Sequence, residues 1–229
     1  MSESTQTFPF LKDSRIENES LDLLKLYGQK NGKRVKAPVP VFDIIEYLGY
    51  DVDFRRDGIY KDMNYLGGLH MAKNLVEINE NLSSQEGRMN FTAAHETGHI
   101  VLHVPMYSEN NEEDESNIIC RVDAGLNGDK KELIEVQADK FAAFLLMPTE
   151  EVKIAFYSLR NRPLYLKRNI IFDFFRKRSL RMSAINFSRK VIKAGNFTNV
   201  SKLAMVNRLI GLELMRGLRY QKTKPGITK

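Results

Sequence analysis

Residues 90–105 read NFTAAHETGHIVLHVP and hold three of the four histidines in the chain. His95, His99 and His103 recur at intervals of four residues, and Glu96 follows the first of them. Residues four apart lie on one face of a helix, so this spacing would align the histidines. The pattern His-Glu-x-x-His predicts a metal site in which two imidazoles bind one ion. The glutamate, rotated by about 100° from the first histidine, would reach the water that the ion activates.

A helix over this segment is also predicted by its flanking residues. Ser83 and Glu86 form an S-x-x-E capping box, and no proline interrupts residues 84–103 before Pro105. Gly98 lies inside the predicted helix, where glycine costs about 1 kcal/mol relative to alanine. We therefore expect another segment to pack closely against Gly98.

A second predicted helix offers carboxylates to this site. It includes EVQADKFAAFLLM, has a predicted N-cap at Asp129, and ends before Pro148. Glu135 and Asp139 are four residues apart and therefore share a face. Glu135 can complete a His2Glu site with an open fourth position, and Asp139 can accept a hydrogen bond from the second ring nitrogen of a histidine ligand.

His103 is not expected to be a third histidine ligand. Residues eight apart in a helix are separated by a rise of about 12 Å, whereas a zinc–nitrogen bond is about 2 Å long. His95, His99 and His103 therefore cannot all bind one ion. His103 is either structural or contacts the substrate or transition state, and Tyr107 is a second candidate for that contact.

The block FTAAHETGHIVLH, with LVEIN and Arg88 before it and EVQADKFAAFLLMP after it, resembles the ImmA/IrrE family of metallo-endopeptidases. The similarity extends upstream to PVPVFDIIEYLGYDV and downstream to NVSKLAMVNRL, and so covers most of residues 37–211. The resemblance implies that His95, His99 and Glu135 bind zinc and that Glu96 is the catalytic acid and base. One departure is Asp139, where the family often has asparagine.

The resemblance also implies a substrate class. Members of this family are zinc- or manganese-dependent proteases that cut helix-turn-helix repressors in mobile elements and stress responses. Some stress-response members carry an additional C-terminal sensor domain, for which 229 residues leave little room. We therefore expect a protease of the shorter, mobile-element type.

The remaining sequence predicts a mostly helical α+β fold, which the resemblance makes zincin-like. Residues 21–28 and 41–49 have the apolar spacing of helices, each ended by a glycine, Gly28 or Gly49. Alternating and β-branched residues between positions 50 and 80 predict a small antiparallel sheet.

A C-terminal helical region completes the predicted fold. Thr149 is expected to cap one helix, and Ser201 another within a helix-turn-helix-like segment. The predicted domains are residues 1–150, a zincin-like metallopeptidase domain, and residues 151–229, a basic C-terminal helical domain. The acidic stretch at residues 106–117 is predicted to be a loop beside the site.

The net charge of +6 conceals two regions of opposite sign. Residues 160–229 carry 18 Lys or Arg against two acids, a net charge of +16, which leaves residues 1–159 at −10. Such a basic region is typical of a protein that contacts an anionic partner, such as nucleic acid or an acidic protein face. We expect it to dock the substrate repressor or to keep the protease near DNA.

The sequence predicts a cytoplasmic protein that does not bind a membrane. Its N-terminus lacks the basic start and apolar core of a signal peptide, and no stretch approaches the roughly 18 to 20 apolar residues of a membrane span. The one cysteine, Cys120, can form neither an intramolecular disulfide nor a CxxC site. Any metal site must therefore use His, Asp and Glu.

Two other functions are compatible with these features. The protein could be a DNA-binding regulator in which the metal is structural and the helix-turn-helix-like segment reads DNA. Structural zinc sites, however, usually fill all four positions with protein ligands and favour cysteine. A module that sequesters a repressor without cutting it is the third hypothesis.

Overall fold

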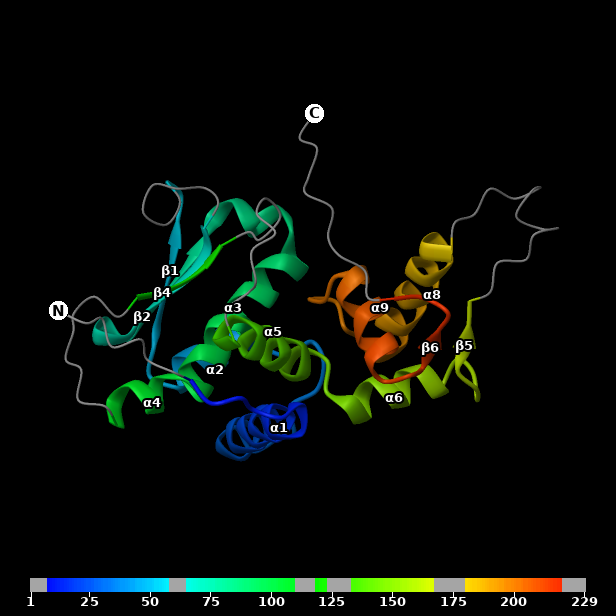
Figure 1. Ribbon diagram of the computed structural model, residues 1–229, viewed down its shortest axis with the longest axis horizontal. Helices are drawn as coiled ribbons and strands as arrows, with labels where there is room; N and C mark the ends of the chain where they lie inside the picture. Colours follow the sequence, from blue (N-terminus) through cyan, green and yellow to red (C-terminus); the bar gives the residue numbers. More distant parts are fainter. Residues whose placement is uncertain (1–7, 58–64, 110–117, 123–132, 167–179, 220–229) are drawn as a thin grey trace.

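The computed structural model describes residues 8–57, 65–109, 118–122, 133–166 and 180–219, with only the backbone at 107–109 and 118–122. The helices of this part of the chain are α1 (Asp13–Lys30), α2 (Val41–Tyr47), α3 (Glu86–Leu102), α4 (Val104–Glu109), α5 (Leu133–Leu146), α6 (Thr149–Tyr157), α8 (Leu180–Gly195) and α9 (Lys202–Gly211). The strands are β1 (Asp51–Arg55), β2 (Tyr65–His70), β3 (Leu75–Asn79), β4 (Ile118–Val122), β5 (Leu164–Tyr165) and β6 (Met215–Arg216). The predicted mostly helical α+β fold is confirmed (Figure 1).

The four-stranded sheet has the order β1-β3-β2-β4 and is mixed. Strand β2 runs antiparallel to β3 and β4, whereas β1 runs parallel to β3. The prediction of a wholly antiparallel sheet is therefore wrong at β1. Strand β3 lies between β2 and β1 in the sheet. It runs antiparallel to β2, which precedes it in the sequence, and parallel to β1. Strand β4 was not predicted, because it follows the acidic run interpreted as a loop.

Two predicted helix starts differ from the structure. A short 3₁₀ helix, Glu80–Ser84, precedes α3 and includes Ser83, so α3 begins at Glu86 and its N-cap, Gln85, makes no side-chain capping bond. The side chain of Asn79 caps this 3₁₀ turn and thereby replaces the predicted capping box.

At the start of α6 the N-cap position is taken by Pro148, which places Thr149 inside the helix. The predicted Thr149 cap is therefore wrong. The Ser201 cap is confirmed, since its Oγ accepts a hydrogen bond from the Ala204 amide at 3.1 Å. The predicted cap at Asp129 lies outside the described residues.

Three further segments can be compared with the prediction, which holds for α2 and differs for α1 and α4. Helix α2 ends as predicted before Gly49, whose φ of +87° is available to glycine at little cost. Helix α1 passes through Gly28 and ends at Lys30. Beyond α3, residues 104–109 form α4 rather than the start of a loop, and residues 110–117 lie outside the described part.

The close packing predicted at Gly98 is present between α3 and α5. A Cβ atom at Gly98 would lie 3.1 Å from the Cα of Ala138 and 3.1 Å from the Cβ of Phe141. Ala138 and Phe141 are fully buried. The missing side chain therefore lets the backbone of α5 approach α3, and this approach places the carboxylates of α5 beside the histidines of α3.

The C-terminal helices join the same hydrophobic core as the N-terminal half. Val191 and Leu209 belong to one cluster of buried residues together with Ile16 of α1 and Ile44 of α2. The division into two domains near residue 150 stays a prediction. Among the described residues, none of the helices has the length and apolar character needed to cross a bilayer.

Arg208 of α9 connects three elements across residue 150. Its guanidinium donates to the carbonyl of Met147 at 2.9 Å, to the hydroxyl of Thr149 at 2.7 Å and to the carboxylate of Glu17 in α1 at 3.0 Å. It also lies 4.6 Å from the ring centroid of Phe144. The Arg208 side chain is buried, and Thr149 also donates a hydrogen bond to Glu17, so the guanidinium completes a small polar network.

We predict that Arg208→Ala lowers the free energy of unfolding by about 2 to 4 kcal/mol, because it removes three hydrogen bonds and the buried cation that pairs with Glu17. The matched control is Arg189→Ala on the exposed surface of α8, which should change stability by less than about 0.5 kcal/mol. Urea denaturation of both variants measures the effect. Equal urea midpoints for Arg208→Ala and the parent protein would contradict a stabilising role for Arg208.

Candidate metal centre

Helices α3 and α5 bring His95, His99 and Glu135 into one cluster. Both imidazoles are fully buried. The Nε2 atoms of His95 and His99 are 3.0 Å apart, and Glu135 places its two carboxylate oxygens 3.3 Å and 3.1 Å from them. One ligand atom from each residue lies within 4.8 Å of the others.

These distances fit a metal ion. Bonds of 2.0 to 2.1 Å in a tetrahedral arrangement separate neighbouring ligand atoms by about 3.3 Å, close to the separations within this cluster. Two imidazoles and one carboxylate are also a donor set that zinc and related divalent ions accept. The predicted set of His95, His99 and Glu135 is thus brought together in a geometry suited to a metal cofactor.

Asp139 of α5 lies beside the ring of His95. Its Oδ1 accepts a hydrogen bond from Nδ1 of His95 at 2.9 Å, so the proton of the neutral ring resides on Nδ1. This leaves Nε2 of His95, the atom that faces Glu135, free of a proton and able to bind a metal.

His103 is fully buried at the C-terminal end of α3. Its Nδ1 lies 3.0 Å from Nδ1 of His99, the ring nitrogen that does not face Glu135, and its Nε2 lies 2.9 Å from Oε1 of Gln137. Both ring nitrogens are thus engaged by protein groups. Tyr107 lies in α4, but its side chain is outside the described part.

Glu96 is also fully buried, against strand β2. A Cβ atom on Gly67 would lie 2.7 Å from Oε1 of Glu96 and 2.5 Å from Cγ2 of Thr92. Glycine at position 67 is therefore needed for the Glu96 side chain to occupy this place. Strand β2 and helix α3 therefore enclose the carboxylate of Glu96.

The protonation states of the cluster suit metal binding. Burial, together with the neighbouring His95, lowers the pKa of His99 to about 4, although the nearby Glu135 carboxylate acts in the opposite direction. Burial alone would raise the pKa of Glu135, but the imidazoles of His95 and His99 beside its oxygens outweigh this and hold that pKa below its ordinary value. Neutral imidazoles and an ionised carboxylate are the forms that bind metals.

The IrrE N-terminal-like domain of peptidase family M78 matches residues 46–168, which include every residue of the cluster. The chain belongs to this family. The resemblance to ImmA/IrrE proteins is thereby confirmed, and with it membership of a metallopeptidase family. No curated protein compared with the chain matches it.

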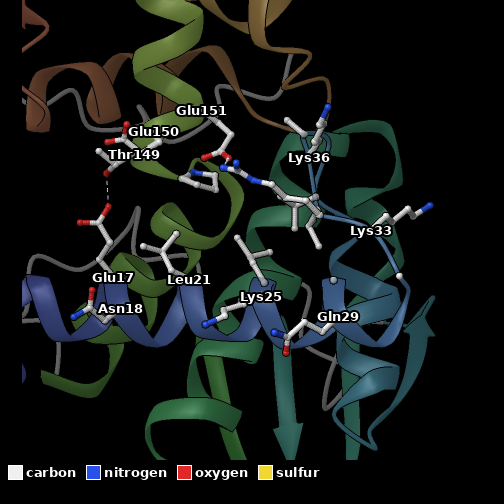
Figure 2. Close-up of a pocket in the computed structure, with 18 of the residues that line it drawn as sticks. Glu17, Asn18, Leu21, Lys25, Gln29, Lys33, Lys36, Thr149, Glu150 and Glu151 are labelled. Carbon is white, nitrogen blue, oxygen red and sulfur yellow. Dashed lines mark hydrogen bonds and ion pairs between the residues drawn. The ribbon is translucent and has the colours of Figure 1, made fainter.

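A separate cavity of about 740 Å³ lies between α1 and the start of α6 in this M78-family chain (Figure 2). Figure 2 shows polar and charged side chains at its rim, including Glu17, Lys25, Lys33 and Glu151. His95, His99 and Glu135 are not among its lining residues. The cavity is therefore not the candidate active site.

Gln137 and Gly67 are not among the residues predicted from the sequence. Gln137 lies between Glu135 and Asp139, but a lone glutamine carries no motif that would identify it. Gly67 lies in the segment predicted to form the sheet, but nothing in that prediction distinguishes it from its neighbours. Its role depends on the distance between β2 and α3, which the sequence does not give.

We predict that Glu135→Ala removes most of the bound metal, because it deletes one of three ligands. Asp139→Ala should retain the site but lower metal affinity by about 10- to 100-fold, since His95 loses the acceptor that orients it. Mass spectrometry of metal content, followed by competition with a chromophoric chelator, separates these outcomes. Full metal loading of folded Glu135→Ala would exclude Glu135 as a ligand.

We predict that the metal-free protein loses stability as the pH falls from about 6.5 to about 4. In this window His99 binds a proton in the unfolded chain but not in the folded protein, so protonation favours unfolding. The contribution of His99 is on the order of 3 kcal/mol across the window.

Urea denaturation at a series of pH values tests this in the parent protein and in His99→Gln, with metal removed by chelation. The variant should show a shallower dependence on pH between 6.5 and 4. If stability depended on pH identically in both proteins, His99 would not be the cause of that dependence.

Proposed function

We propose that this protein is a zinc-dependent endopeptidase that cuts a helix-turn-helix transcriptional repressor. The observation that carries the proposal is the cluster of His95, His99 and Glu135 with the Glu96 carboxylate on the same helix. A glutamate from a second helix as third ligand corresponds to a gluzincin-like arrangement. Within the part of the chain that the structure describes, the cluster has three protein ligands, which would leave a position open for a water or a substrate and so supports a catalytic rather than a structural metal.

His95, His99 and Glu135 would hold the ion, which when bound supplies a Lewis acid that polarises the scissile carbonyl and makes a water more acidic. Manganese would serve the same purpose with these nitrogen and oxygen donors. Asp139 would orient His95 for binding the ion through its hydrogen bond to Nδ1.

Glu96 performs the proton transfers of the proposed reaction. It accepts a proton from the attacking water as the water oxygen bonds to the carbonyl carbon. It then donates this proton to the amide nitrogen as the carbon–nitrogen bond breaks, which gives a carboxylic acid and an amine. The contact with Gly67 supports this role, because it limits the positions that the carboxylate can adopt.

The basic C-terminal region is proposed to hold the substrate or to keep the enzyme near DNA. Arg189, Lys190 and Lys193 are exposed on α8, and Lys202 is exposed at the start of α9. A repressor bound to its operator presents phosphates beside its own surface, and a basic patch is attracted to them. A protease that cuts such a repressor would act in the regulation of a mobile element or a stress response.

A DNA-binding regulator with a structural metal remains the second candidate, favoured by the Ser201-capped helix α9 that follows the basic helix α8. The two functions differ in their need for Glu96. A regulator that only reads DNA does not use a buried carboxylate beside a metal with an open position.

We predict that Glu96→Gln binds metal as the parent protein does but no longer cleaves the repressor. The amide preserves the size of the side chain and removes its ability to accept a proton. The measurement is incubation of each metal-loaded protein with helix-turn-helix proteins encoded beside this gene, followed by mass spectrometry of the products.

A second arm of this experiment uses parent protein treated with chelator and then resupplied with zinc or manganese. Activity should disappear and return. Cleavage by Glu96→Gln at the parental rate, or cleavage that persists after verified removal of metal, would exclude the mechanism.

A further inference from the structure

We infer that His103 and Gln137 are positioning residues for His99, and that they connect this ligand to the N-terminal segment at Pro9. The inference rests on the proposed function, because it takes His99 as a metal ligand. It concerns which of the two ring nitrogens of His99 carries the proton, and therefore whether the other one can bind a metal.

Three hydrogen bonds follow one another from His99 outwards. Nδ1 of His99 lies 3.0 Å from Nδ1 of His103, and Nε2 of His103 lies 2.9 Å from Oε1 of Gln137. The amide nitrogen of Gln137 donates to the carbonyl of Pro9 at 2.9 Å.

The last bond of this chain fixes the direction of the others. The carbonyl of Pro9 can only accept, so the Gln137 amide nitrogen donates to it and the Gln137 oxygen faces His103. That oxygen requires a proton on Nε2 of His103. Neutral His103 then has an unprotonated Nδ1, which accepts a hydrogen bond from Nδ1 of His99.

The result is a His99 ring with its proton on Nδ1. Its Nε2, which lies 3.1 Å from Glu135, is then unprotonated and can bind a metal. The opposite direction would place the proton of His99 on Nε2 and block metal binding. The chain therefore selects the metal-binding tautomer of His99.

Burial makes this selection strong. His99 and His103 are fully buried and Gln137 is 2% exposed, so water is poorly placed to replace a lost bond. The ring of Phe8 contacts the ring of His103 edge-on at 5.8 Å between centroids. Residues 8 and 9 thus cover His103 and accept the final hydrogen bond, although they lie outside the region that matches the family.

The two histidine ligands are consequently supported in different ways. His95 donates to the carboxylate of Asp139, whose side chain is 33% exposed. His99 donates to a neutral, buried chain that ends at a backbone carbonyl on a different segment. Loss of these hydrogen bonds should weaken metal binding without removing a metal ligand.

The test uses the full-length protein and two variants that break the chain at different points. His103→Phe retains a ring of similar size against Phe8 but removes both nitrogens, and Gln137→Leu removes the amide. Thr97→Val is the matched control, because it removes a buried side-chain bond of α3, from Thr97 to the carbonyl of Ala93, without touching the chain.

The first readout is the dissociation constant for zinc, measured by competition with a chromophoric chelator. We expect each chain variant to bind zinc about 10- to 100-fold more weakly than the parent protein, and Thr97→Val to bind with nearly parental affinity. Parental affinity in folded His103→Phe and Gln137→Leu would overturn the inference.

The second readout is the tautomer of His103 in the zinc-loaded parent protein, obtained from long-range ¹H–¹⁵N correlation NMR of the imidazole. We expect the proton on Nε2, and a proton on Nδ1 would overturn the inference even if a variant failed to fold. If the parent protein bound no zinc, the proposed function and this inference would both fail. If it bound zinc and cleaved its substrate while the chain variants behaved as the parent, only this inference would fail.

Discussion

The close approach of α3 and α5 at Gly98 is the constraint on which the candidate centre depends. A side chain at this position would press against the backbone and side chain of α5, at 3.1 Å from Ala138 and from Phe141. Glu135 and Asp139 lie on α5 within one turn of Ala138, whereas His95 and His99 flank Gly98 on α3. The contact between the two helices therefore sets the distance between the imidazoles and the carboxylates.

Local spacing explains why the site could be predicted from the sequence. His95 and His99, like Glu135 and Asp139, are four residues apart, and one helical turn is enough to align each pair. The cost of glycine in a helix also pointed to the contact at Gly98, which the structure contains. The sheet could be predicted only in part, because the insertion of β3 between β1 and β2 is a property of chain topology.

Contacts between distant parts of the chain could not be predicted from the sequence. Pro9 and Gln137 are joined by a hydrogen bond across 128 positions, and Arg208 reaches Glu17 across 191. No periodicity or motif in the sequence indicates that such residues are in contact. The predicted cap at Ser83 failed for a more local reason, since Asn79 starts a 3₁₀ turn that includes this serine.

The most direct test of the account is the anomalous diffraction of zinc in a crystal of the zinc-loaded protein. The account predicts one strong peak about 2.0 to 2.2 Å from Nε2 of His95, from Nε2 of His99 and from a carboxylate oxygen of Glu135, with His103 not bound to the ion. A zinc ion bound through His103, or a zinc ion located away from Glu135, would contradict it.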